Sequence, residues 1–100
     1  METKKLALIV EDEAPICHFM TTVLSANGYR VVSTGKGLEI PALASSHCPD
    51  IVLLDLGLPD IDGIEALRSF REWSDIPVVI VSARGNEKDK VAALDLGADD

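Results

Sequence analysis

The sequence is poor in aromatic and basic side chains, and it has no long apolar run. Only four of its 100 residues are aromatic although 47% are hydrophobic, so a packed core must be mostly aliphatic. Nine Lys and Arg stand against 17 Asp and Glu, and the net charge of -8 argues against nucleic-acid binding by this chain itself. No apolar stretch approaches the roughly 18 residues of a membrane-spanning helix, and no secretory signal follows residues 1–5. We therefore expect one cytoplasmic domain without a membrane association.

Cysteine is also scarce. Cys17 and Cys48 lie far apart, without CxxC spacing and without a histidine placed to complete a zinc site. Because free cysteine is often part of a protein core, we expect both to be small buried thiols.

Acidic residues directly follow two short apolar runs. The run 6–10 leads into Glu11 and Asp12, and the run 51–54 leads into Asp55. Unbroken apolar strands are typical of a parallel sheet that is covered on both faces. If the two strands are parallel neighbours, three carboxylates converge at one sheet edge, where their repulsion is costly unless a cation lies between them. The pattern indicates a site for a divalent metal and an oxyanion.

Strands alternate with helices along the whole chain. We expect strands at residues 6–10, 29–33, 51–55 and 77–82, and helices that begin near residues 15, 38, 64 and 88. The first helix has an apolar face that we expect to be buried, formed by Ile16, Phe19, Met20, Val23 and Leu24. Short connections imply right-handed crossovers and a parallel sheet with helices on both faces. A strand order of 2-1-3-4 would bring the three acids together, at the edge where such sheets bind ligands.

The turn at residues 57–63 contains two further acids. Asp60-Ile61-Asp62-Gly63 resembles the nucleophile signature of haloacid-dehalogenase-type phosphatases, but there the first Asp leaves a buried strand directly, and Asp55 already holds that position. The Gly-x5-Glu pattern of an EF-hand is missing as well. We expect both acids to shape the turn and to cap the next helix, with Asp62 as its N-cap.

Four segments together resemble the receiver domain of two-component response regulators. They are Val10-Glu11-Asp12-Glu13, the stretch from Leu53 to Gly63, Val79-Ile80-Val81-Ser82-Ala83-Arg84, and Gly97-Ala98-Asp99-Asp100. The resemblance covers essentially the whole chain and implies a flavodoxin-like, three-layer α/β fold. The turn at 57–63 and Glu72-Trp73-Ser74 before Ile76-Pro77 look most like the KdpE type of the OmpR/PhoB family, which controls potassium-uptake operons.

The resemblance implies a role for each acid of the cluster. Asp55 matches the phosphoacceptor, which takes a phosphoryl group from a sensor histidine kinase. Asp12 matches a direct ligand of Mg2+ and Glu11 a ligand through water, while the backbone carbonyl of Gly57 would supply another oxygen. Such a domain is a signalling phosphoacceptor that assists its own phosphotransfer and dephosphorylation, rather than an enzyme.

Further positions match the switch and the dimer surface of the family. Ser82 matches the hydroxyl residue that reorients toward the phosphoryl group, and Ala83 the small residue that leaves the pocket open. Lys90, Asp99 and Asp100 match residues that form ion pairs across a homodimer after phosphorylation. Alternatively, these three are solvated surface charges of little energetic effect.

The resemblance also predicts what lies beyond this sequence. Receivers have five strands and five helices, so we expect residues 1–100 to be a C-terminally incomplete receiver that lacks the fifth strand and fifth helix. DNA would be bound only through an output domain outside these residues. An alternative function is a degenerate receiver that acts as a phosphorylation-independent interaction or dimerisation module. The set of Glu11, Asp12, Asp55 and Ser82 argues against it.

Overall fold

Four parallel strands form the central sheet. The computed structural model describes residues 4–81, and the predicted helix near residue 88 lies outside that part. The elements in chain order are β1 (Leu6–Val10), α1 (Ala14–Ala26), β2 (Arg30–Thr34), the short 3-10 helix η1 (Gly37–Glu39), α2 (Ile40–His47), β3 (Ile51–Leu54), α3 (Gly63–Arg71) and β4 (Val78–Ile80). The strand order is β2-β1-β3-β4 and every pair is parallel, which confirms the predicted topology.

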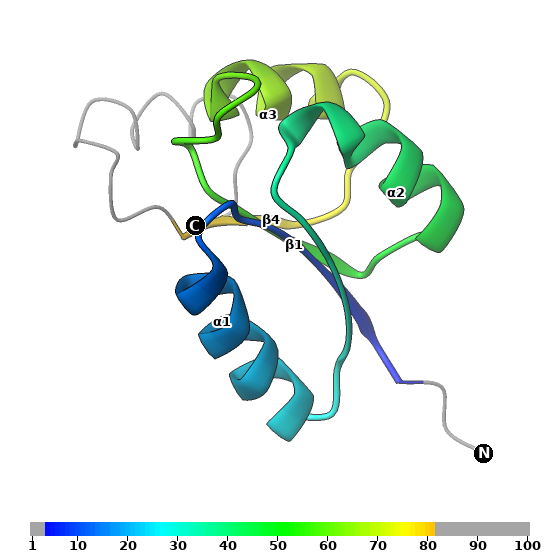
Figure 1. The fold of residues 1–100 in the computed structure, drawn as a ribbon. Coiled ribbons are helices and arrows are strands. Elements are labelled where there is room, and N and C mark those ends of the chain that lie inside the picture. The colour runs from blue at the N-terminus through cyan, green and yellow to red at the C-terminus, as the bar shows by residue number, and fades with distance from the viewer. Residues whose placement is uncertain (1–3, 82–100) are drawn as a thin grey trace.

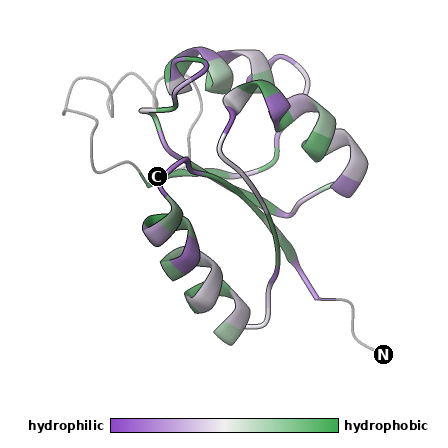
Figure 2. Ribbon diagram, viewed as in Figure 1, coloured by the Kyte–Doolittle hydropathy of each residue, from purple (hydrophilic) through white to green (hydrophobic). Residues whose placement is uncertain are grey.

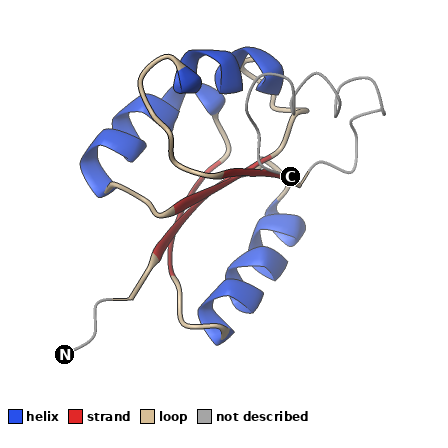
Figure 3. Cartoon of the chain, turned by 180° about the vertical axis from the view of Figure 1, so that it is seen from behind, coloured by secondary structure: helices blue, strands red, loops and turns tan. Residues whose placement is uncertain are grey.

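Helices cover both faces of the sheet. Figures 1 and 3 show α1 on one face and α2 with α3 on the other, so the molecule has three layers. Hydrophobic residues run along the strands in Figure 2, and every residue of β1 is buried, as expected for an inner strand between two helical layers. Within residues 4–81, no helix combines the length and the apolar character needed to cross a membrane.

The main hydrophobic core lies between the sheet and the pair α2 and α3. Helix α3 buries residues at helical spacing, Ala66, Leu67 and Phe70, and α2 buries Ile40 and Ala44. These side chains form one cluster with strand residues that include Leu8, Val10, Val52, Leu54 and Val78. The packing fixes α3 against the sheet, and with it the turn that connects β3 to α3.

The apolar face of α1 is less buried than predicted. No residue of α1 is fully buried, and Phe19 and Val23 are 67% and 43% exposed. Helix α1 packs on β1 and β2, and among residues 4–81 it is the only helix on its face of the sheet. A helix without a neighbouring helix buries only the side that meets the sheet, so the flank with Phe19 and Val23 faces solvent.

Local signals in the sequence set most element ends. Gly28 has a φ of 88° after the end of α1, a conformation that glycine adopts without strain. The helix predicted to begin near residue 38 is η1 followed by α2, with Pro41 in the first turn of α2, where no backbone N–H is needed. The second and fourth strands are displaced or shortened relative to the prediction, to Arg30–Thr34 and Val78–Ile80.

The prediction that both cysteines are buried is wrong. Cys17 is half-buried in α1, and Cys48 is exposed. Cys48 ends α2 in a left-handed conformation with a φ of 47°, where the chain reverses toward β3 at the surface. At this turn no other element within residues 4–81 packs over the Cys48 side chain, so it is exposed.

Candidate functional site

The three acids of the predicted cluster lie together at the carboxyl edge of the sheet. Val10 is paired with Leu54 across β1 and β3, so the residues that follow these two strands are neighbours. Backbone hydrogen bonds extend the pairing, because the Asp55 amide donates to the Val10 carbonyl at 2.9 Å and the Glu11 amide donates to the Thr34 carbonyl at 2.9 Å. The sheet itself therefore fixes where the three side chains start.

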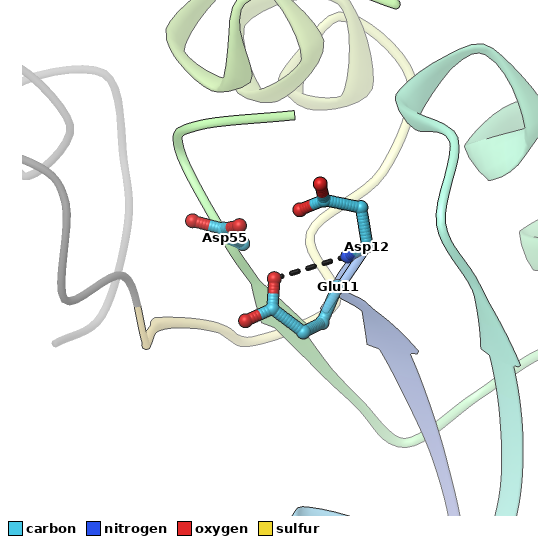
Figure 4. A group of neighbouring side chains, drawn as sticks. All are labelled: Glu11, Asp12 and Asp55. Carbon is cyan, nitrogen blue, oxygen red and sulfur yellow. Dashed lines mark hydrogen bonds between the residues drawn. The ribbon is translucent and has the colours of Figure 1, made fainter. Parts of the chain in front are cut away.

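The carboxylates of Glu11, Asp12 and Asp55 face one another across a small space (Figure 4). One oxygen from each lies within 4.8 Å of the others. Glu11 and Asp55 are only 5% and 1% exposed, whereas Asp12 is exposed. The cluster therefore has two buried acids and one acid open to solvent, on the side from which a ligand can enter.

Burial and neighbouring charge act strongly on Glu11. Burial raises the pKa of Glu11 from 4.5 to about 8, aided by its hydrogen bond with Asp55 and by the charges of Asp55 and Asp12. The backbone amide of Asp12, which donates to Oε2 of Glu11 at 3.0 Å, lowers the pKa but does not offset these effects. The raised pKa favours the protonated form of Glu11, which relieves part of the repulsion in the cluster.

This donor set suits a divalent cation that prefers oxygen ligands. Carboxylate oxygens are the ligands that Mg2+ takes, and one or two of them suffice in sites that also bind phosphate. A cation would replace the proton of Glu11 as the charge that holds the acids together. The arrangement therefore fits Mg2+ by the chemistry and the spacing of its oxygens.

The turn after β3 is folded tightly behind Asp55. The Gly57 amide donates to Oδ1 of Asp55 at 3.0 Å, and the Gly63 amide donates to the Leu56 carbonyl at 3.0 Å. Gly63 passes so close that an added Cβ would lie 2.4 Å from the Cα of Leu56 and 2.9 Å from the Asp55 carbonyl oxygen. A side chain at position 63 would push on the backbone that carries the acid, which explains a glycine there.

The predicted site residues divide into two groups. Glu11, Asp12 and Asp55 are brought together, and Gly57 lies in the turn that follows, with its amide on Asp55. The remaining predictions concern residues outside the described part of the chain, namely Ser82, Ala83, Lys90, Asp99 and Asp100.

The two acids of the turn have different partners, only one of which was predicted. Asp62 caps α3 as expected, because its Oδ1 accepts from the Ile64 amide at 2.9 Å. Asp60 does not cap α3: its two oxygens accept from the Gly37 and Leu38 amides, each at 2.9 Å, at the start of η1. The partners of Asp60 lie more than 20 residues away in the sequence, and no local motif signals such a contact.

Comparison with known proteins places this geometry in context. The protein-family model named response regulator receiver domain matches residues 7–100 of the sequence. The KDP operon transcriptional regulatory protein KdpE of Escherichia coli (strain K12) is 50% identical over 93 residues, which are 93% of this chain and 41% of that protein. This chain thus spans less than half the length of that relative.

Two solved structures extend the comparison to the fold. The Mn2+-bound form of the response regulator Rcp1 matches with a TM-score of 0.84 and 28% identity, over 95% of this chain and 77% of that chain. The phosphorylated cyanobacterial phytochrome response regulator RcpA matches with a TM-score of 0.87 and 29% identity, over 97% of this chain and 78% of that chain.

Proposed function

The chain belongs to the response regulator receiver domain family, and from this membership we propose that Asp55 accepts a phosphoryl group from a sensor histidine kinase in the presence of Mg2+. One observation supports the proposal most strongly. Asp55 is almost fully buried, yet its carboxylate faces two further acids at the carboxyl edge of a parallel sheet. Such an arrangement is costly without a cation, so it indicates a binding site rather than a structural detail.

We assign the metal to the oxygens around Asp55. Asp12 and Asp55 would bind Mg2+ directly, Glu11 through water, and Gly57 through its backbone carbonyl. When bound, the cation would neutralise charge on the transferring phosphoryl group. The relative Rcp1, whose solved form is Mn2+-bound, supports a divalent cation in a protein of this fold.

The chemical step requires little from the chain beyond positioning. A carboxylate oxygen of Asp55 attacks phosphorus, the bond between phosphorus and the imidazole nitrogen of the donor histidine breaks, and the nitrogen keeps the electron pair. The Gly57 amide on Oδ1 and the Asp55 amide on the Val10 carbonyl hold the nucleophile in one orientation. The product is an aspartyl phosphate, as the phosphorylated state of the relative RcpA suggests.

The downstream steps rest on the family alone. Ser82 would turn its hydroxyl toward the phosphoryl group, Ala83 would keep the pocket open to the donor, and Lys90, Asp99 and Asp100 would pair with a second copy in a homodimer. In the cytoplasm, a DNA-binding output domain beyond these residues would then act on its target. The 50% identity with KdpE supports regulation of a potassium-transport operon.

The proposal is tested by phosphorylation with a small donor. The full-length protein is incubated with acetyl phosphate with and without Mg2+, and its mass is measured intact. We expect one added phosphoryl group that requires Mg2+ and is released by hydroxylamine. Asp55→Asn should remove it, whereas Asp75→Asn, which changes an exposed acid outside the cluster, should not. An adduct that persists in Asp55→Asn would refute the assignment, and a wild type that never reacts would favour the phosphorylation-independent interaction module.

A further inference from the structure

The segment from the end of β2 to the start of α2 contacts both the end of β1 and the turn after β3. We call residues 34–39 the brace. On the side of β1, the Glu11 amide donates to the Thr34 carbonyl at 2.9 Å. Gly35 lies so close to the next acid that an added Cβ would be 3.3 Å from the Cα of Asp12. The brace thus touches the backbone of both acids that follow β1.

On its other side, the brace is held by Asp60. The carboxylate of Asp60 accepts from the amides of Gly37 and Leu38, each at 2.9 Å, one on each oxygen. These hydrogen bonds, that of Leu38 foremost, lower the pKa of Asp60. At Gly37 an added Cβ would be 2.4 Å from a methyl carbon of Ile61, so the brace and the turn after β3 are in close contact.

Hydrogen bonds within the brace connect its two ends. The hydroxyl of Thr34 donates to the Glu39 carboxylate, and the Lys36 amide donates back to the Thr34 hydroxyl oxygen at 3.1 Å. Backbone and side-chain hydrogen bonds therefore link Glu11, through Thr34 and the start of η1, to Asp60. Asp60 itself lies five residues after Asp55, in the turn that carries Gly57.

We propose that Asp60 is a positioning residue for the metal and phosphoryl site, and that it acts through the brace to hold the ends of β1 and the turn after β3 at a fixed separation. This inference rests on the proposed function, because it concerns the same three acids. A cap for η1 alone would need only a short polar side chain at its N-cap position. The residue at that position is Lys36, whose side chain does not cap η1. Asp60, from the turn after β3, caps it instead. A long-range cap of this kind ties two segments together.

The test compares the two acids of one turn. Asp60→Ala removes both hydrogen bonds to the brace, Asp60→Asn leaves one acceptor oxygen, and Asp62→Ala removes only the cap of α3. Backbone amide NMR signals of the full-length protein are recorded without metal and then during a titration with Mg2+ alone. We expect Asp60→Ala to shift the amide signals of Asp12 and Gly35 before any metal is added, and to weaken Mg2+ binding about 10-fold. The signal shifts and the Mg2+ affinity of Asp60→Asn should lie between those of Asp60→Ala and the wild type.

Asp62→Ala is the control for general loosening of the turn. It should leave the signals of Asp12 and Gly35 in place and change Mg2+ affinity by less than about twofold. Unshifted Asp12 and Gly35 signals in Asp60→Ala, or equal Mg2+ affinity in Asp60→Ala and Asp62→Ala, would overturn the inference. A wild type that does not bind Mg2+ would refute the proposed function instead, and the metal-free signals alone would then decide the role of Asp60.

Discussion

Two groups of acids lie at the same edge of the sheet, and the protein surrounds them in opposite ways. Asp60 and Asp62, in the turn after β3, each accept hydrogen bonds from backbone amides. The bonds from the Leu38 and Gly37 amides lower the pKa of Asp60. Glu11 faces Asp55 and Asp12, and burial beside them raises its pKa to about 8. Backbone amides thus stabilise the charged form of Asp60, whereas burial and the neighbouring acids destabilise the charged form of Glu11.

The contrast separates acids that bond to the backbone from acids that face a ligand site. A carboxylate that caps helix N–H groups contributes to folding without help from any ligand. Carboxylates that repel one another in a buried cluster cost stability, and the natural way to recover it is a cation or a proton. Substitutions in one group can therefore serve as controls for substitutions in the other.

The largest effect is expected for Asp12→Ala. Because Asp12 would bind the cation directly, we expect a loss of Mg2+ affinity of more than about 100-fold, above the range typical for residues that only support a ligand. Phosphorylation by acetyl phosphate should fall with it. The measurement is a Mg2+ titration followed by amide NMR signals, with Asp62→Ala as the control. Equal Mg2+ affinity in the two variants would remove the distinction between the groups.

A smaller effect is expected for the pH dependence of stability, which Glu11 should dominate in the absence of metal. Folded Glu11 holds its proton up to a pKa of about 8, whereas the unfolded chain releases it near 4.5, so between these values the folded state binds more protons. The free energy of unfolding should therefore decrease as pH rises from about 4.5 to about 8.

Glu11→Gln tests this dependence because the amide cannot titrate. Urea unfolding without metal, at steps of pH across the window from 4.5 to 8, should show a flatter profile for the variant than for the wild type. Saturating Mg2+ should also flatten the wild-type profile, since ligation requires the ionised carboxylate. Parallel profiles for the two proteins would show that Glu11 titrates as an ordinary exposed acid does.

The smallest effect is expected for Asp62→Ala. Loss of the N-cap of α3 should lower the free energy of unfolding by about 1 kcal/mol, measured by urea denaturation. Mg2+ affinity should stay within about twofold of the wild type. A stability change accompanied by a large loss of Mg2+ binding would show that the turn and the cluster are not independent at this residue.

The sequence predicted the part of the site that depends on strand ends. Glu11, Asp12 and Asp55 follow apolar runs directly, and in a parallel sheet of order β2-β1-β3-β4 the register places them side by side. Asp62 was also predictable, because an N-cap acts on amides two or three residues away. Signals of this kind are local or depend only on topology.

Contacts that depend on tertiary packing were missed. The hydrogen bonds of Asp60 to Gly37 and Leu38 follow from how the turn after β3 lies against η1, which no spacing in the sequence encodes. The exposure of Phe19 and Val23 depends on what lies beside α1, not on the apolar periodicity of α1 itself. Periodicity identifies the apolar face of a helix, whereas neighbours decide how much of it is buried.

The assignment of Asp55 as the phosphoacceptor is best tested by locating the phosphoryl group. The protein is incubated with acetyl phosphate and Mg2+, an aspartyl phosphate is reduced with borohydride to homoserine, and peptide mass spectrometry finds the altered position. We expect homoserine at position 55 and unchanged aspartate at positions 60 and 62. Homoserine at position 60 or 62, with aspartate retained at position 55, would refute the assignment of Asp55.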